Sequence, residues 1–283
     1  MENLGDAMTR LMNKFLKKVG TCPMCNGDLL AWKGKNKDGT ERCAPTCVAC
    51  GYSDLKRKAD IETQQIYDKS LKARTLNLFK NGSMIVDKNL FNKTFENYKL
   101  LDEEAKTAKQ KADEFVKCVL NNEPRHFVLT GKSGVGKSHL SMAIAWAVIE
   151  RSGYDKKVLF INYQELLSEL KKAFKDDVMY KLLHQSLLQD IKTVDLVILD
   201  DLGAELGGTV DYNATSFNND ILYSILEARQ EKALVVNSNL NSEEMNTAYG
   251  NRIVSRIMNN SQGFLMRNKS SKDRQVVGVG EAS

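Results

Sequence analysis

The sequence predicts an α/β protein in which a domain with a central parallel sheet follows a small cysteine-rich module and a helical linker. Three observations predict this organisation. Short apolar, β-branched segments alternate with segments of helical spacing through the C-terminal two thirds of the chain. A glycine-rich motif lies where one such strand gives way to a helix. Two Cys-x-x-Cys pairs lie near the N-terminus.

Composition and charge limit the class of protein. The chain has 283 residues, of which 42% are hydrophobic and 27% charged, as in ordinary soluble globular proteins. It contains no apolar run that could span a bilayer and no apolar signal-peptide core, so we expect a cytosolic protein without a membrane partner. Residues 1–90 hold 16 Lys/Arg against 10 Asp/Glu, whereas the rest hold 25 against 26. This basic surplus suits an acidic partner or nucleic acid, but it is also common on ordinary solvated surfaces.

Residues 1–20 have the pattern of an amphipathic helix. Apolar residues recur every three or four positions, and basic side chains lie toward the other face. Three interpretations remain open: the apolar face packs on the module that follows, binds a partner protein, or lies on a membrane surface. We rank packing first and the membrane last.

Residues 21–55 are typical of a zinc ribbon. The pairs Cys22/Cys25 and Cys47/Cys50 have the spacing of two knuckles that together form a closed Cys₄ site, so we expect a structural Zn²⁺. Cys43 is an alternative ligand, but Gly51 favours the Cys47/Cys50 knuckle because it allows a tight turn after the last ligand. A redox role would need a Cys-x-x-Cys that enters a helix in a βαβ unit, and that context is absent.

The remaining chain divides into a linker and a large domain. We predict three parts: the N-terminal helix plus zinc ribbon at 1–55, a helical linker at 56–85, and a nucleotide-binding domain at 86–283. The linker carries Lys56, Arg57 and Lys58, which a nucleic-acid backbone could contact, although a plain surface helix is the favoured interpretation. Apolar spacing predicts a further helix over 103–120.

The glycine-rich motif is the central chemical signal. Residues 131–138 fit G-x-x-x-x-G-K-[ST] at every fixed position, between an apolar strand at 126–130 and a helix. Backbone N–H groups of such a loop form an anion site, which predicts ATP binding. Lys137 would reach the β- and γ-phosphates, and the Ser138 hydroxyl would ligate Mg²⁺. The predicted phosphate-binding residues are Gly131, Lys132, Ser133, Gly134, Val135, Gly136, Lys137 and Ser138.

An acidic motif follows the glycine-rich motif along the chain. Between the two motifs we predict a strand at 157–161 and helices at 163–174 and 178–192. The apolar strand 194–199 ends in Asp200 and Asp201, which is the Walker B arrangement. We expect Asp200 to hold the Mg²⁺ shell and Asp201 to polarise the attacking water. Because Asp is shorter than the more usual Glu at the second position, we expect slow hydrolysis.

Three further positions are predicted to act on the γ-phosphate. Asn239 follows the strand 233–236 and is a candidate sensor of that phosphate. Arg252 and Arg256 lie four residues apart on one helix face, so one of them could reach a neighbouring subunit as an arginine finger. A last strand is expected at 274–279, with Arg274 at its start.

These residues together resemble the DnaC/DnaI-type helicase loaders of the AAA+ superfamily and the related IstB-type transposition ATPases. The resemblance covers about 91–283 and is carried by residues 94–98, 131–140, 198–205, 218–223, 227–229, 238–240 and 252–256. It implies an AAA+ ATPase core with a nucleotide site that includes His139. It also implies Asn239 as sensor 1, Arg256 rather than Arg252 as the arginine finger, and Arg274 as a sensor-2 equivalent.

The resemblance also implies partners and an activity. A loader binds single-stranded DNA and a hexameric replicative helicase, forms a homo-oligomer through its ATP interfaces, and hydrolyses ATP weakly, with stimulation by DNA or assembly. The zinc-binding N-terminal domain would contact the helicase in the cytoplasm of a bacterium or of a phage-infected cell. One alternative is an IstB-like transposition accessory ATPase. A distant alternative is a small-molecule kinase, which would need an acceptor pocket and mobile lid arginines.

Overall fold

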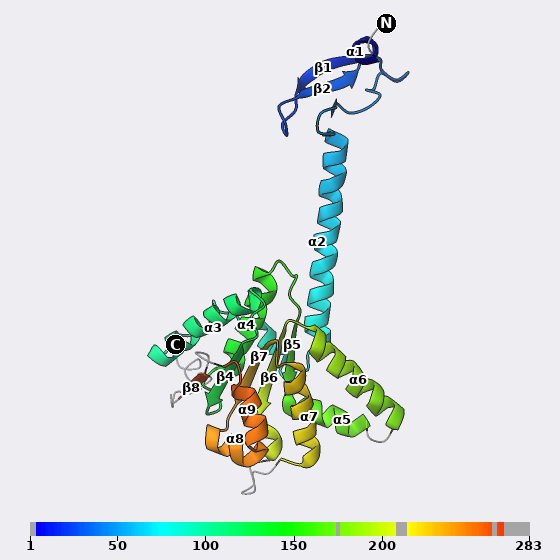
Figure 1. The fold of residues 1–283 in the computed structure, drawn as a ribbon. Coiled ribbons are helices and arrows are strands. Elements are labelled where there is room, and N and C mark those ends of the chain that lie inside the picture. The colour runs from blue at the N-terminus through cyan, green and yellow to red at the C-terminus, as the bar shows by residue number, and fades with distance from the viewer. Residues whose placement is uncertain (1–3, 174–175, 208–213, 262–264, 269–283) are drawn as a thin grey trace, which may run out of the picture. The chain divides into compact units, whose positions relative to one another are not determined.

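The computed structural model describes residues 4–173, 176–207, 214–261 and 265–268. The chain forms two compact units, Met1–Ser70 and Leu71–Ser283, and the division falls inside helix α2 (Asp54–Gly82) (Figure 1). The domain boundaries predicted from the sequence, at 55/56 and 85/86, stay predictions. Among the described residues, no helix is both long and apolar enough to cross a membrane.

The N-terminal unit is a small antiparallel sheet preceded by a helix. Helix α1 (Leu4–Phe15) leads into β1 (Leu16–Thr21), which pairs with β2 (Asp28–Trp32), and β2 pairs with the short β3 (Thr46–Cys47). The expectation of one helix through residue 20 was therefore wrong at its C-terminal end. Residues 16–21 instead pair with β2, and Val19, Gly20 and Thr21 are poor helix formers.

Most of the apolar face of α1 is open to solvent. Phe15 contacts Trp32 of β2, with ring centroids 5.9 Å apart. By contrast, Met8 and Leu11 are 64% and 57% exposed. The interpretation ranked first was that α1 packs on the cysteine module. It accounts for the Phe15 contact but leaves Met8 and Leu11 exposed within the unit.

The second unit is built on a parallel sheet, as the sequence predicts. Its strands are β4 (His126–Gly131), β5 (Val158–Asn162), β6 (Leu196–Leu202), β7 (Ala233–Ser238) and β8 (Leu265–Asn268), in the order β5-β6-β7-β4-β8. The strand β8 was not predicted, because its run is short and ends in Arg267 and Asn268. The strand expected at 274–279 lies outside the described residues.

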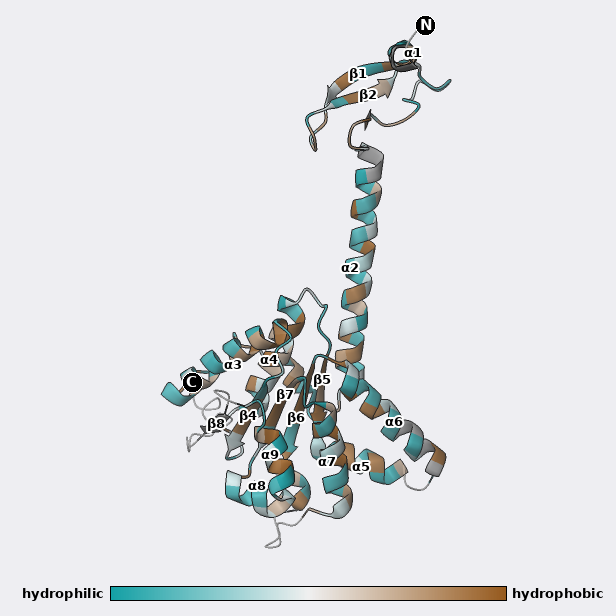
Figure 2. Cartoon of the chain, viewed as in Figure 1, coloured by the Kyte–Doolittle hydropathy of each residue, from teal (hydrophilic) through white to brown (hydrophobic). Residues whose placement is uncertain are grey.

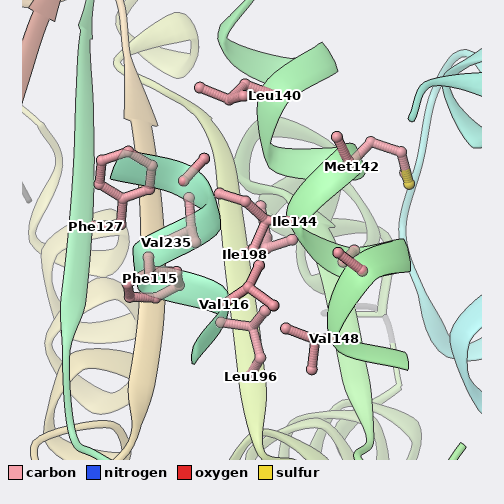
Figure 3. Packing of buried hydrophobic residues seen from close by; sticks show 14 of the residues in the cluster. Phe115, Val116, Phe127, Leu140, Met142, Ile144, Val148, Leu196, Ile198 and Val235 are labelled. Atoms are coloured by element: carbon pink, nitrogen blue, oxygen red, sulfur yellow. The ribbon is translucent and has the colours of Figure 1, made fainter. Parts of the chain in front are cut away.

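Helices cover both faces of this sheet. Successive side chains of a strand point to opposite faces, so each buried strand contributes apolar side chains to both. Phe127 and Leu129 of β4 pack in one apolar core with helices α3 (Glu103–Leu120) and α4 (Lys137–Arg151), whereas Val128 packs in the other. Figure 3 shows the first core, where residues of α3 and α4 meet residues of β4, β6 and β7. The second core includes residues of α5 (Tyr163–Ala173), α6 (Asp177–Thr193), α7 (Ser216–Ala228), α8 (Ser242–Tyr249) and α9 (Asn251–Met258).

The segment after α2 extends the edge of the sheet. The Met84 N–H donates to the Phe160 carbonyl at 2.8 Å, and the Asn162 N–H donates to the Met84 carbonyl at 2.8 Å. Just upstream, Phe79 is fully buried and its ring is 5.0 Å from that of Trp146 in α4. These contacts fix the start of the segment that continues into the short 3₁₀ helix η1 (Lys88–Asn92).

Hydrophobic and hydrophilic residues are mixed along the described part of α2, whereas the central strands are mostly hydrophobic (Figure 2). In the N-terminal unit, Ile66 and Tyr67 of this helix are 70% and 54% exposed. This pattern fits the surface helix that was the favoured interpretation of the linker.

The most buried charge joins the N-terminal ends of two strands. Arg229, immediately after α7, is fully buried and donates to the carbonyls of Ile191, Val194, Asp195 and Ala233 at 2.9, 2.8, 2.7 and 2.5 Å. Burial lowers its pKa to about 9, so the guanidinium stays charged at neutral pH. The planar guanidinium thereby satisfies four backbone acceptors at once.

We expect Arg229→Lys to destabilise the second unit by roughly 2–4 kcal/mol, because an ammonium group cannot reach all four carbonyls. Urea unfolding followed by the fluorescence of Trp146, in a Trp32→Phe background, measures the change. The matched control is Arg74→Lys, at an exposed position of α2, which should change stability by less than about 0.5 kcal/mol. Equal midpoints for the two variants would contradict this structural role of Arg229.

Candidate functional site

The predicted phosphate loop joins β4 to α4. Gly134 and Gly136 have φ of 82° and 94°, in the left-handed region where a side chain would be strained. Gly136 immediately precedes α4, and it has no side chain that could cap the helix N-terminus. The first N–H groups of α4 therefore remain available to an anion, as the motif predicts.

Lys137 is buried at the floor of this loop. Its ammonium donates to the Gly131 carbonyl at 2.7 Å, to the Lys132 carbonyl at 2.8 Å and to Asn239 Oδ1 at 2.7 Å. Burial lowers its pKa, and the carboxylates of Asp201 and Asp200 act in the opposite direction. All three ammonium protons are thus in use, so a phosphate would bind Lys137 by taking the place of one of these acceptors.

Asp200 is the acidic centre of the site. Its Oδ1 accepts from Ser138 Oγ at 2.9 Å and from Asn237 Nδ2 at 2.6 Å. Burial raises its pKa to about 6, and these two hydrogen bonds only partly offset that effect. The structure thus brings together the two residues that the sequence assigned to Mg²⁺.

Asn237 is a member of this site that the sequence reasoning missed. It is fully buried in β7, and its Oδ1 accepts from Ser141 Oγ at 2.9 Å while its amide holds Asp200. A signal was available, because an amide inside an otherwise apolar strand is costly unless polar partners lie beside it. The asparagine therefore links α4, β6 and β7 behind the candidate magnesium ligands.

Asp201 and Asn239 lie at the ends of adjacent strands, β6 and β7. Asp201 has φ of 60°, which is unusual for a residue with a side chain, and the β6–β7 register shifts between Leu199 and Leu202. Such local strain is found at functional sites. Asn239 follows β7, which lies between β4 and β6 as predicted, and it contacts Lys137 directly.

An open cleft of about 750 Å³ surrounds these groups, a volume within the range of small-molecule sites. It is lined by Lys137, Ser138, Asp200, Asp201 and Asn239 together with the segment after α2. That segment contributes Ile85, Val86, Asp87 and Leu90, residues to which the sequence reasoning gave no role. No signal in the sequence pointed to them, because their place depends on the pairing of Met84 with β5.

His139 also lines the cleft, but its ring is held by the segment before α3. Its Nε2 lies 3.1 Å from the Thr94 carbonyl and 2.8 Å from Asn97 Oδ1, and Tyr98 meets it edge to face. Residues 94–98, which carry the family resemblance, are therefore anchored on the first turn of α4.

The residues present fit ATP and Mg²⁺. The loop offers backbone donors and Lys137 to phosphates, while Ser138 and Asp200 offer the hard oxygen ligands that Mg²⁺ takes. When bound, the ion would neutralise charge on the β- and γ-phosphates. Among the described residues, Asp200 Oδ2 accepts no hydrogen bond, so it is available for this contact.

The predicted arginine pair lies elsewhere on the domain. Arg252 and Arg256 are both on α9, and both contact Tyr223 of α7. Neither is among the residues that line the cleft of the same chain. Arg274 lies outside the described residues.

The N-terminal cysteines form the cluster that the spacing predicts. The sulfur atoms of Cys22, Cys25, Cys47 and Cys50 all lie within 4.8 Å of one another, and Cys43 is not part of this group. The Cys22–Cys50 and Cys25–Cys47 sulfur pairs are 3.5 and 3.6 Å apart. Four thiolates about 2.3 Å from one tetrahedral ion would have sulfurs roughly 3.8 Å apart, so the cluster fits a zinc ion.

The backbone around the cluster has the turns of two knuckles. The Cys22 N–H donates to the Gly27 carbonyl, and Asn26 has φ of 58°. Gly51 has φ of 73°, which agrees with the tight turn expected after the last ligand. A Cβ atom at Gly27 would lie 3.3 and 3.4 Å from the sulfurs of Cys25 and Cys47, so this glycine gives the cluster its space.

We expect Asp200→Asn to make the folded protein more stable while it abolishes ATP hydrolysis. Because burial raises the pKa of Asp200 from 3.8 to about 6, the folded chain holds this proton more tightly than the unfolded chain. Stability therefore falls as pH rises between these two values, and the loss at neutral pH is roughly 3 kcal/mol. Asparagine removes the charge and keeps the acceptor, so ligand-free Asp200→Asn should melt roughly 3–8 °C higher at pH 7.5 and hydrolyse no ATP with Mg²⁺.

The control is Asp220→Asn, on an exposed position of α7, which should change neither property. Thermal unfolding at pH 4 and pH 7.5 should show a difference between Asp200→Asn and wild type at the higher pH only. An Asp200→Asn melting temperature at or below that of wild type at pH 7.5 would contradict the raised pKa.

We expect about one zinc ion per chain in the purified protein, held by the four clustered cysteines. Cys25→Ser should lose the metal, whereas Cys43→Ser, matched in exposure, should keep it. Elemental mass spectrometry measures the zinc, and circular dichroism measures folding after chelation. Full zinc content in Cys25→Ser, or its loss in Cys43→Ser, would show that the ligand set is different.

Curated relatives resemble the chain, one of them over nearly its full length. It is 26% identical over 282 residues to the replicative helicase loader DnaC of Escherichia coli K12, an alignment that spans 98% of this chain and 99% of that protein. A DnaC from Buchnera aphidicola, of the Acyrthosiphon pisum subspecies, is 27% identical over 172 residues, which are 59% of this chain and 63% of that protein.

Solved structures show the same fold. The crystal structure of the DnaC helicase loader superposes with a TM-score of 0.54 at 20% identity, covering 65% of this chain and 100% of that one. The DnaI crystal structure superposes with a TM-score of 0.53 at 25% identity, covering 65% and 95%. These matches confirm the AAA+ fold and the resemblance to loaders of the DnaC/DnaI type.

The sequence family of IstB-like ATP binding proteins matches residues 54–275. This range contains the phosphate loop, the acidic pair after β6, Asn239 and the arginine pair of α9. The chain belongs to the family of IstB-like ATP binding proteins.

Proposed function

We propose that this protein is an ATP-dependent loader of a hexameric replicative helicase, acting on single-stranded DNA in the bacterial cytoplasm during the initiation of replication. One observation carries the proposal. The similarity to the replicative helicase loader DnaC spans 98% of the chain and so includes the cysteine unit, which lies outside the IstB-like match at 54–275. An ATPase that shared only its core with loaders would not need this extension.

The nucleotide site supports an ATPase in this role. Lys137 and the backbone of the loop would bind the phosphates, and Ser138 and Asp200 would hold Mg²⁺. Asp201 would orient and polarise the attacking water, with Asn239 as the sensor that links the γ-phosphate to Lys137. Because the side chain at position 201 is an aspartate, hydrolysis would be slow unless assembly or DNA improves the geometry.

The arginine pair supports a homo-oligomer. Arg252 and Arg256 lie outside the cleft of their own chain, so they would act on ATP only if a second copy brought its cleft to α9. An arginine supplied in this way neutralises the charge that develops on the transferred phosphoryl group. In this proposal ATP binding therefore promotes assembly, and hydrolysis promotes release.

The N-terminal unit is the proposed contact with the helicase. Its zinc ion would be structural, because four cysteine ligands leave no open position. The exposed residues of α1, Met8 and Leu11, offer apolar anchors of the kind that helix-mediated contacts use. The proposal includes single-stranded DNA because a loader must deliver its helicase to a separated strand.

A second candidate follows from the matched family itself. An IstB-like accessory ATPase would act on duplex target DNA for a transposase and would have no helicase partner. The two candidates share the nucleotide site, so only the partner distinguishes them. Duplex-DNA binding with no helicase contact would favour this candidate.

We expect full-length protein with ATP and Mg²⁺ to co-elute with the replicative helicase of its host in size-exclusion chromatography. Leu11→Asp should weaken this complex at least about tenfold, because it places a charge in an apolar contact. The control is Ile66→Asp, which is also exposed but lies on α2 and should bind like wild type. Absence of a complex with the wild-type protein would contradict the loader proposal, whereas equal binding by the two variants would contradict only the contact assigned to α1.

A further inference from the structure

One tyrosine holds both arginines of α9. Tyr223 accepts at its hydroxyl from Arg252 Nη2 at 2.7 Å and from Arg256 Nη2 at 2.8 Å. Both guanidinium groups also lie over its ring, 4.3 and 4.4 Å from the centroid. A single side chain of α7 thus makes a hydrogen bond and a cation–π contact with each arginine.

The two arginines have no carboxylate partner among the described residues. Two like charges four positions apart on a helix repel each other, and Tyr223 offsets that repulsion without neutralising it. Arg256 Nη1 also donates to the Arg252 carbonyl, at 3.3 Å. Two positive charges with no carboxylate partner indicate a place prepared for an external anion with several oxygen atoms, which is the chemistry of a phosphate.

Packing between the helices does not require the tyrosine. The buried side chains of Leu222 on α7 and of Ile253 and Ile257 on α9 already belong to one apolar core. Tyr223 is only half-buried, and its described contacts are made with the arginines. Its place is therefore better explained by what it does to the two guanidinium groups than by the joining of α7 to α9.

We propose that Tyr223 is a positioning residue, which holds Arg252 and Arg256 ready for the γ-phosphate of ATP bound to a neighbouring copy. This inference rests on the proposed oligomeric ATPase. A free arginine side chain loses considerable rotamer entropy when it is fixed, and Tyr223 removes much of that cost before the subunits meet. A phosphate oxygen accepts more strongly than a neutral phenol, so it displaces the hydroxyl, while the ring continues to support the guanidinium.

Mixed assemblies of two full-length variants test this inference. One chain carries Arg252→Ala and Arg256→Ala, so it binds ATP but supplies no arginine. The other carries Lys137→Ala, so it supplies arginines but has no working site. Steady-state ATP hydrolysis is measured with single-stranded DNA. Only an interface at which the second chain offers its arginines to ATP bound by the first chain can then be active. Tyr223 is changed in the second chain alone.

We expect the Lys137→Ala chain to restore hydrolysis to the arginine-free chain. Adding Tyr223→Phe to it should lower kcat about fivefold, and adding Tyr223→Leu should lower kcat at least tenfold, because the ring is lost as well. The KM for ATP should not change, since the nucleotide is bound by the other chain. The control, Tyr67→Phe in the same chain, alters an exposed tyrosine of α2 and should have no effect.

The outcomes separate this inference from the proposal on which it rests. No hydrolysis in the first mixture would contradict the arginine finger in trans, and Tyr223 would lose its role with it. Restored hydrolysis that Tyr223→Phe and Tyr223→Leu leave unchanged would overturn the positioning role alone. A fall in kcat that merely follows a fall in assembly, measured by sedimentation of the same mixtures, would also overturn it.

Discussion

The burial of charge at the C-terminal ends of the central strands is the constraint on which the site depends. Lys137 and Asp200 are both more than nine tenths hidden from solvent, yet they do not form a direct ion pair. Each is instead bound by neutral groups: Lys137 by carbonyl oxygens and Asn239, and Asp200 by Ser138 and Asn237. A direct pair would satisfy both charges and leave little for a ligand. Neutral partners keep the two charges apart and available, which suits a site that must exchange protein contacts for phosphates and a metal ion.

A second buried charge lies at the opposite ends of the strands, and its described hydrogen bonds are all to the backbone. There Arg229 gives its Nη donors to four backbone carbonyls, and these come from the start of β7, the end of α6 and the turn between α6 and β6. Both ends of the sheet therefore contain a buried cation, but with different acceptors. Four backbone carbonyls hold Arg229, whereas Lys137 binds two carbonyls of the glycine-rich motif and a side-chain amide. The difference between a structural and a functional buried charge lies in how easily its partners can be replaced.

The fold and the first contacts of the site could be predicted because they depend on local patterns. Apolar strand segments, segments of helical spacing, the glycine-rich loop and the Cys-x-x-Cys spacing are all local features of the sequence. They correctly predicted that β4 leads into α4 and that the four sulfurs lie in one cluster. Contacts made by pairing between distant segments could not be found in this way. The segment at residues 85–90 reaches the cleft only because Met84 pairs with β5, and Tyr223 meets the arginines only because α7 packs on α9. The helix expected through residue 20 failed for the same reason, since strand pairing with β2 overrode a helical period.

The loop after β6 suggests how the cleft and the arginine helix are joined within one chain. Glu205 accepts from the Gly203 N–H at 2.9 Å, two residues beyond Asp201, and its other oxygen accepts from the Tyr249 hydroxyl at the end of α8. Gly250, with φ of 77°, then turns the chain directly into α9, so Arg252 lies only three residues after Tyr249. Burial raises the pKa of Glu205, and the Tyr249 and Gly203 donors counter this effect. A carboxylate buried between these two elements therefore ties the end of β6 to the end of α8, directly before the helix that carries the arginines.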